Sequence, residues 1–166
     1  MKTAELVSIE EYLHSGFQPD REYVDGEIQE RNLGEKDHSG VQKRVIGFFL
    51  RLEGTTELRV WPEQRVQVKP THFRVPDVCV TIREPEEQVF TEPPYIIIEI
   101  LSPEDTVTKL MERVRDYEDL GVRNIWIVDP SARRAWVAGG GALQPVETLR
   151  SGGEPEVMLE VAKLFA

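Results

Sequence analysis

The chain has 166 residues, of which 40% are hydrophobic and 30% charged, and its formal net charge is −10. This length suits one domain with its own core, which we expect to span residues 1–166. The apolar and charged fractions exclude wholesale disorder. No apolar run approaches the roughly 18–20 residues of a membrane-spanning helix, and the N-terminal segment lacks the apolar stretch of a signal peptide.

Cys79 is the only cysteine. Because no disulfide can form within the chain, we expect a reducing, cytoplasmic location. The acidic balance opposes non-specific binding to nucleic acid, which depends on cations that neutralise phosphates. An enzyme can still gather its cations on one face, although each basic residue taken singly is typical of a solvated surface. The candidates for such a face are Lys43, Arg44, Arg51, Lys109, Arg113, Arg115, Arg123, Arg133 and Arg134.

The first third of the chain predicts a short helix, a hairpin and a long helix. Ser8 followed by Glu11 forms a capping-box pattern for a helix over residues 8–16. Residues 21–31 predict a hairpin with Asp25-Gly26 in its turn. The long helix should run from about Asp37 to Glu53, because its apolar residues repeat with the spacing of a one-sided helix.

Four strands and a crossover helix are predicted next. Residues 60–68 and 73–82 flank a short connection that suits antiparallel pairing. Residues 95–101 and 124–130 are continuous apolar runs, as expected of strands covered on both faces. The helix between them should be capped by Ser102, with Pro103 at its first position, Asp105 completing the capping box and Gly121 ending it, and it implies a right-handed parallel crossover. A hairpin over residues 135–147 and a short closing helix over 157–165 complete the predicted order.

Glu99 interrupts the apolar strand YIIIEIL near its C-terminal end. Burial of an ionised carboxylate costs several kcal/mol unless a cation compensates it, and ligands gather at the C-terminal ends of parallel strands. The residue therefore has two equal interpretations. It is either a functional acid or the partner of a core arginine such as Arg74 or Arg113.

Asp77 favours the functional interpretation. It lies in VPDVCV, where alternation places it on one face with Val75 and Cys79, and Pro76 predicts a bend beside it. A Pro-Asp pair is also common in plain turns. Two acids in apolar strands of one small sheet, however, are the oxygen ligands that Mg²⁺ prefers. The three histidines, His14, His38 and His72, lack the spacing of a zinc site.

These segments, in this order, resemble the core of the PD-(D/E)xK nuclease superfamily and, more narrowly, the Uma-type restriction endonuclease family. The motifs that carry the resemblance are REYVDGE, His38 at the start of the long helix, VPDVCV, YIIIEILSPED and RVRDYEDLGVRNIWIVDP. The resemblance covers nearly the whole chain. It implies an α/β fold with a restriction-endonuclease-like core, in which a central mixed β-sheet is flanked by helices, with an N-terminal helix-hairpin and a C-terminal β-hairpin.

The same resemblance implies a metal-dependent phosphodiesterase that acts on DNA. Asp77 and Glu99 correspond to the Mg²⁺ (or Mn²⁺) ligands. Glu22 and His38 fall on positions that the family tends to keep near its site, and we expect them to line it.

The sequence departs from the family pattern at the lysine. The parent motif has a lysine two residues after the Glu, where this chain has Leu101; Uma-type proteins usually supply it from the next helix, where this chain has Arg113. At about 100° per residue, Arg113 flanks the apolar arc beside Tyr117, whereas Lys109 points more nearly to the opposite side. We therefore predict Arg113 as the inward catalytic cation, with Lys109 as the weaker candidate. An arginine stays protonated and cannot act as a base.

Two functions follow as hypotheses. The first is a Mg²⁺- or Mn²⁺-dependent endonuclease that hydrolyses phosphodiester bonds in DNA. The second is a catalytically inactive nuclease-fold module that binds nucleic acid or protein, which the missing lysine and the acidic charge favour. We expect no membrane partner, and the sequence leaves a homodimer open.

Overall fold

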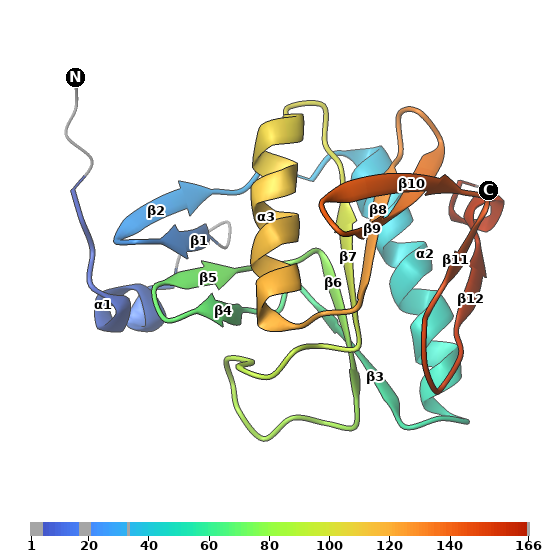
Figure 1. Ribbon diagram of the computed structural model, residues 1–166, viewed down its shortest axis with the longest axis horizontal. Helices are drawn as coiled ribbons and strands as arrows, with labels where there is room; N and C mark the ends of the chain where they lie inside the picture. Colours follow the sequence, from blue (N-terminus) through green and yellow to red (C-terminus); the bar gives the residue numbers. More distant parts are fainter. Residues whose placement is uncertain (1–4, 17–20, 33, 166) are drawn as a thin grey trace.

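A six-stranded mixed sheet organises the molecule (Figure 1). The computed structural model describes residues 5–16, 21–32 and 34–165. The strand order is β10-β9-β8-β7-β6-β3, and only β7 and β8 are parallel neighbours. The strands are β3 (Leu58–Pro62), β6 (Val78–Ile82), β7 (Ile96–Ile100), β8 (Asn124–Asp129), β9 (Arg134–Gly139) and β10 (Ala142–Val146).

Two long helices cover opposite faces of this sheet. Helix α2 (Lys36–Glu53) packs Val41, Val45 and Phe49 against one face, and α3 (Val107–Leu120) packs Leu110, Val114 and Tyr117 against the other. All residues of β7 are buried, as its continuous apolar run predicted. Helix α3 connects β7 to β8, so the predicted parallel crossover is present.

A second sheet has the order β2-β1-β5-β4 and lies beside α3 (Figure 1). The predicted hairpin forms its outer half, and Asp25 and Gly26 both have positive φ, as its tight turn requires. The short helix α1 (Ile9–His14) is capped by Ser8, whose Oγ accepts from the Glu11 N–H. The strands are β1 (Arg21–Val24), β2 (Glu27–Glu30), β4 (Val66–Lys69) and β5 (His72–Arg74).

Three predicted elements differ from the structure. The strand predicted over 60–68 is divided between two sheets at Glu63, which has a positive φ of 49°, and the one over 73–82 is divided before Val78. The closing helix is instead strand β12 (Met158–Glu160), paired with β11 (Thr148–Arg150), and a 3₁₀ turn, Val161–Leu164. Pairing with a neighbouring strand overrode the local pattern there.

The start of α3 was also predicted wrongly. The helix begins at Val107, and its N-cap is Thr106, whose side chain accepts from the Lys109 N–H. Ser102 does not cap it. Its backbone N–H and its hydroxyl both donate to Asp105, at 2.8 and 3.0 Å, which closes a separate turn before the helix. The sequence Ser-Pro-Glu-Asp satisfied the capping pattern but belongs to this turn.

Within the described residues, no helix is both long enough and apolar enough to cross a membrane.

Candidate active site

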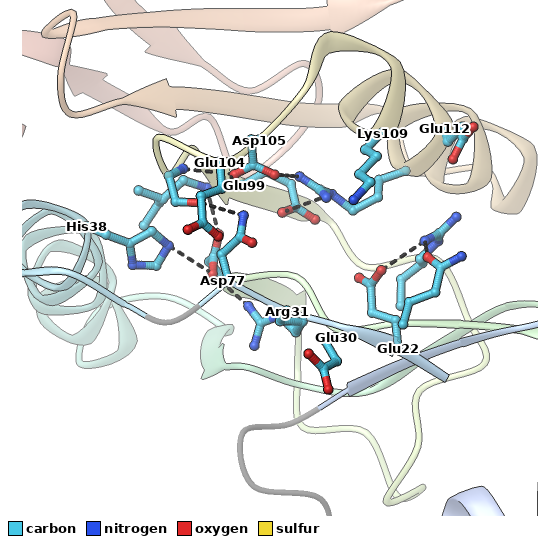
Figure 2. Close-up of a pocket in the computed structure, with 16 residues that line it drawn as sticks. Glu22, Glu30, Arg31, His38, Asp77, Glu99, Glu104, Asp105, Lys109 and Glu112 are labelled. Atoms are coloured by element: carbon cyan, nitrogen blue, oxygen red, sulfur yellow. Dashed lines mark hydrogen bonds and ion pairs between the residues drawn. The ribbon is translucent and has the colours of Figure 1, made fainter. Parts of the chain in front are cut away.

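A cavity of about 340 Å³ opens between the two sheets and the first turns of α3. Both predicted metal-binding carboxylates line it (Figure 2). Asp77 immediately precedes β6, and Glu99 lies near the C-terminal end of the neighbouring strand β7. The lining residues are Glu22, Gln29, Glu30, Arg31, Asn32, His38, Arg74, Asp77, Glu99, Ile100, Ser102, Glu104, Asp105, Lys109, Glu112 and Arg113.

Asp77 is buried, with 4% of its surface exposed, and both carboxylate oxygens have partners. Oδ2 accepts the backbone N–H of Ile100 at 2.7 Å, which fixes the carboxylate against β7. Oδ1 accepts from Arg31 Nη2 at 2.7 Å and lies 3.3 Å from His38 Nε2. The contact with Asp77 is the main cause that raises the pKa of His38. Asp77 therefore lies between a fixed backbone donor on one side and a guanidinium and an imidazole on the other.

Glu99 is equally buried and faces α3. Its Oε1 accepts from the Tyr117 hydroxyl at 2.5 Å, and its Oε2 lies 3.5 Å from Arg113 Nε. Burial raises the pKa of Glu99 from 4.5 to about 7; Arg113 opposes the shift, and the negative charges of Asp77 and Glu22 add to it. An additional cation bound beside this carboxyl group would favour its ionised form.

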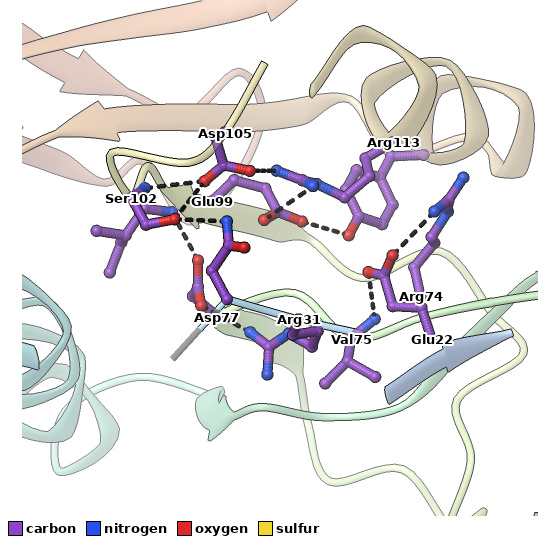
Figure 3. A network of polar contacts seen from close by, with 12 residues as sticks. Glu22, Arg31, Arg74, Val75, Asp77, Glu99, Ser102, Asp105 and Arg113 are labelled. Carbon is purple, nitrogen blue, oxygen red and sulfur yellow. Dashed lines mark hydrogen bonds and ion pairs between the residues drawn. The ribbon is translucent and has the colours of Figure 1, made fainter. Parts of the chain in front are cut away.

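Arg113 connects Glu99 to the turn before α3. Its Nη2 donates to Asp105 Oδ1 at 3.1 Å, and the other oxygen of Asp105 accepts from Ser102 (Figure 3). Burial alone would raise the pKa of Asp105, but hydrogen bonds from Ser102 and the charge of Arg113 lower it. Of the two core arginines predicted as partners of Glu99, Arg113 does contact it. Arg74 does not; it pairs with Glu22 and Asp116 instead.

Glu22 joins the site through a buried ion-pair network. Its Oε2 accepts from Arg74 Nη1 at 2.9 Å, and its Oε1 accepts the Val75 N–H at 3.1 Å. Arg74 Nε in turn donates to Asp116 on α3 at 2.7 Å. Because Glu22, Arg74 and Asp116 come from β1, β5 and α3, this network fixes the second sheet against the helix that carries Arg113.

The structure places His38 and Lys109 at the same cavity. His38 lies on the first turn of α2, and its Nδ1 is buried without a hydrogen-bond partner among the described residues. Lys109 is exposed and lines the cavity rim (Figure 2). The prediction from helix periodicity that its side chain points away from the site was therefore wrong. A long side chain one turn before Arg113 can reach back toward the N-terminal end of the helix.

Sequence reasoning missed Arg31, Ser102 and Asp105 as members of this site. Arg31 follows a strand with no motif of its own, and only its three-dimensional contact with Asp77 identifies it. Ser102 and Asp105 were recognised, but as a helix cap. One sequence feature could have placed them near the site: they directly follow the strand that carries Glu99, and ligands gather at such strand ends.

The donor chemistry of the cavity fits a hard divalent cation. Asp77, just before β6, and Glu99, on the neighbouring strand β7, offer carboxylate oxygens to the cavity, and Mg²⁺ commonly takes one or two carboxylates and completes its shell with water. Among the described residues, no group of three or more His, Cys, Asp or Glu side chains is placed to hold a metal ion. A cation held here would therefore need water or substrate oxygens as its remaining ligands.

Comparisons with known proteins bear on the family and the fold of the chain. The profile of the Uma2 family, described as "Putative restriction endonuclease", matches residues 9–165. A solved structure, described as a "putative nuclease belonging to DUF820" from Anabaena variabilis ATCC 29413, has a TM-score of 0.80 and 22% sequence identity; the match covers 96% of this chain and 97% of that one. Comparison with curated proteins gives no match. The solved structure establishes the restriction-endonuclease-like fold, and by the extent of the profile match the chain belongs to the Uma2 family.

Proposed function

We propose that this protein is an endonuclease that hydrolyses phosphodiester bonds in DNA and requires Mg²⁺ or Mn²⁺. The observation that carries the proposal is the pair of buried acids at one open cavity, Asp77 just before β6 and Glu99 on the neighbouring strand β7. Family membership supports nuclease chemistry. The metal and the DNA substrate are our own inference from the oxygen donors and from the resemblance noted in the sequence.

Asp77 and Glu99 would hold the cation, which supplies Lewis acidity and offsets negative charge on the scissile phosphate. The Ile100 N–H keeps the Asp77 carboxylate in place, and the Tyr117 hydroxyl does the same for Glu99. Arg113 carries a permanent positive charge at the cavity wall and would orient a phosphate group. Lys109 at the rim would add an exposed charge where the substrate enters.

Arg31 has a further role in this proposal. Its guanidinium contacts Asp77 Oδ1, an atom that a metal ligand would offer to the cation. Arg31 neutralises this buried acid, and because its side chain also lines the cavity it would contact a phosphate bound there. His38, on the same oxygen, can hold or release a proton beside the site.

The test is a cleavage assay on duplex DNA with Mg²⁺, Mn²⁺ or excess chelator. We expect metal-dependent cutting by the wild type and none by Asp77→Ala or Glu99→Ala. Glu112→Ala is the matched control, because Glu112 lines the same cavity but is exposed. Calorimetry should detect binding of Mn²⁺ to the wild type and to the control, and none to the two site variants.

Loss of cutting in Glu112→Ala to the same extent as in Glu99→Ala would contradict the assignment of the acids. Cutting that persists in excess chelator would contradict the metal requirement. If no metal binds and DNA is bound but never cut, the protein is an inactive nuclease-fold module. The arginine at position 113, where the family usually has a lysine, would then be the most direct explanation for the missing activity.

A further inference from the structure

A second groove, of about 750 Å³, lies on the other side of the N-terminal half of α2. The cationic groove, as we call it, carries four basic side chains and one acidic one. Its charged lining residues are Lys36, Asp37, Lys43, Arg44 and Arg133. All four cations are exposed, and within the described part of the chain none of them forms an ion pair with a carboxylate. Their charge is therefore available to a ligand.

The groove and the site cavity lie on either side of the first turn of α2, at one end of the central sheet. His38 lines the site cavity from the first turn of α2, while its neighbours Asp37 and Ser39 line the cationic groove. The groove wall also includes the turn after β8, and β8 is the parallel neighbour of β7, which carries Glu99. Leu101 N donates to Val128 O at 2.8 Å, so the ends of these two strands lie side by side. In Figure 1 the start of α2 and the β8–β9 turn lie at the same edge of the molecule.

Helix periodicity concentrates the charge on one side of α2. Lys36, Gly40, Lys43 and Arg44 are spaced at i, i+4, i+7 and i+8, which places them on a common face. Gly40 has no side chain between the cations; a Cβ built on it would lie 3.3 Å from Arg44 Nη1. Lys36 lies in the first turn, where the helix dipole favours anions and disfavours a lysine. Lys36 therefore destabilises the helix at this position, whereas it would attract an anionic ligand there.

Contacts with the C-terminal segment hold the two arginines in place. Arg44 Nη1 donates to Leu164 O at 3.3 Å, and Arg133 Nη2 donates to Phe165 O at 3.0 Å. The Arg133 guanidinium also lies over the Phe165 ring, 5.6 Å from its centroid. Since these bonds go to carbonyl groups, they orient the guanidinium groups without neutralising them. Oriented charges lose less side-chain entropy when they bind a ligand.

The site cavity has the opposite character. Its lining includes seven carboxylates against four Lys and Arg side chains, and the whole chain is strongly acidic. An approaching polyanion is thus repelled by most of the surface, and its binding requires a local concentration of cations. The cationic groove supplies this concentration next to the cavity.

We infer that the cationic groove binds the phosphodiester backbone of the nucleic acid whose scissile bond lies in the site cavity. The inference rests on the proposed function for its substrate. It adds that Lys36, Lys43, Arg44 and Arg133 contact phosphates several nucleotides away from the cutting position. These contacts contribute affinity without base specificity, because they reach only the backbone.

The test measures binding separately from cleavage. Labelled duplex and single-stranded DNA are titrated in excess chelator, at salt concentrations from about 50 to 200 mM. The variant Lys36→Ala/Lys43→Ala should bind the duplex roughly tenfold more weakly at the lowest salt, and its log–log salt slope should fall by about 1.8. The corresponding fall for the single strand is about 1.4.

The matched control is Arg51→Ala/Arg123→Ala, which removes two exposed charges away from the groove. It should keep the wild-type affinity and slope. Equal weakening in both double variants, or none in the groove variant, would overturn the inference. So would a wild type that binds neither DNA, in which case an acidic protein is the alternative occupant. If the groove variant loses binding but no protein cuts DNA with any metal, the groove assignment stands and the proposed catalysis fails.

Discussion

At Arg113 one guanidinium contacts two acids of different kinds. Glu99 is a candidate metal ligand, with an elevated pKa, whereas Asp105 is held ionised in the turn before α3. The charge of Arg113 is thus shared between the reaction centre and the backbone that supports it. Lys109, on the same helix, is exposed at the rim and makes no such contact.

We therefore predict different losses for the two cations. Arg113→Ala should lower cleavage at saturating metal by roughly a hundredfold or more, and Lys109→Ala by less than about tenfold. Arg113→Lys should retain or increase activity, because it restores the group that the resemblance leads us to expect. Rates must be measured on variants shown by circular dichroism to be folded. A dead Lys109→Ala beside a near-normal Arg113→Ala would reverse the assignment.

The elevated pKa of Glu99 predicts a pH dependence of stability without metal. The folded protein binds this proton up to about pH 7, while the unfolded chain releases it near 4.5. The contribution of Glu99 to the free energy of unfolding is therefore greatest below pH 4.5 and declines as the pH rises to 7. Relative to Glu99→Gln, the wild type should lose up to about 3 kcal/mol across this window.

Urea unfolding of both proteins in excess chelator, between pH 4.5 and 8, measures this difference. Glutamine has nearly the shape of glutamate, and its side-chain oxygen can accept the hydrogen bond from the Tyr117 hydroxyl. The comparison therefore isolates the effect of the charge on Glu99. Parallel stability curves for the two proteins would show that Glu99 is ionised throughout, with Arg113 compensating its burial.

At the scale of elements, one buried arginine connects three of them. Arg74 of β5 binds Glu22 of β1 and Asp116 of α3, and both acids are buried. Arg74→Met should lower the free energy of unfolding by about 3–5 kcal/mol, because it leaves the buried Glu22 without its ion-pair partner and removes one of the cations around Asp116, which keeps Lys69 and His72. Arg83→Met is the control: its ion pair with Glu57 is exposed, and its loss should cost less than about 1 kcal/mol. Equal losses in denaturant unfolding would show that the network contributes little.

The long elements could be predicted because each has its own pattern. The apolar spacing of α2, the capping of α1 by Ser8 and the turn at Asp25-Gly26 are local properties of the sequence. The start of α3 was wrong for a similar reason. Ser102 and Thr106 both offer hydroxyls to a helix, and only the bond from Ser102 to Asp105 decides between them.

At the scale of the molecule, the site depends on contacts that no local pattern indicates. Asp77 and Glu99 were predicted because acids in apolar strands are unusual. Arg31 was not, because nothing in the sequence around it indicates its distance from Asp77. The division of residues 60–82 between two sheets is likewise a matter of long-range pairing, since β5 pairs with β1 almost fifty positions earlier in the chain.

The net charge of −10 describes the whole chain and not its separate surfaces. It weighed against nucleic acid, yet the same surface separates an acidic cavity from a cationic groove on either side of α2. Lys43, Arg44 and Arg133 stood among the basic residues that the sequence offered for one face. Their grouping depends on the C-terminal segment, which orients both arginines.

The position of Asp77 also limits how the length of the chain can vary among its relatives. Residues 75–77 are the whole connection between β5 of one sheet and β6 of the other. The Val75 N–H is held by Glu22 and the Asp77 carboxylate by Ile100, so both ends of the connection are anchored. An added residue there would displace one anchor or the acid itself. The turn at Gly140-Gly141 is exposed, and its contact with α3 is a long bond of 3.5 Å from the Gly141 N–H to Glu118 Oε1, so insertions should accumulate at that hairpin tip and be absent from 75–77.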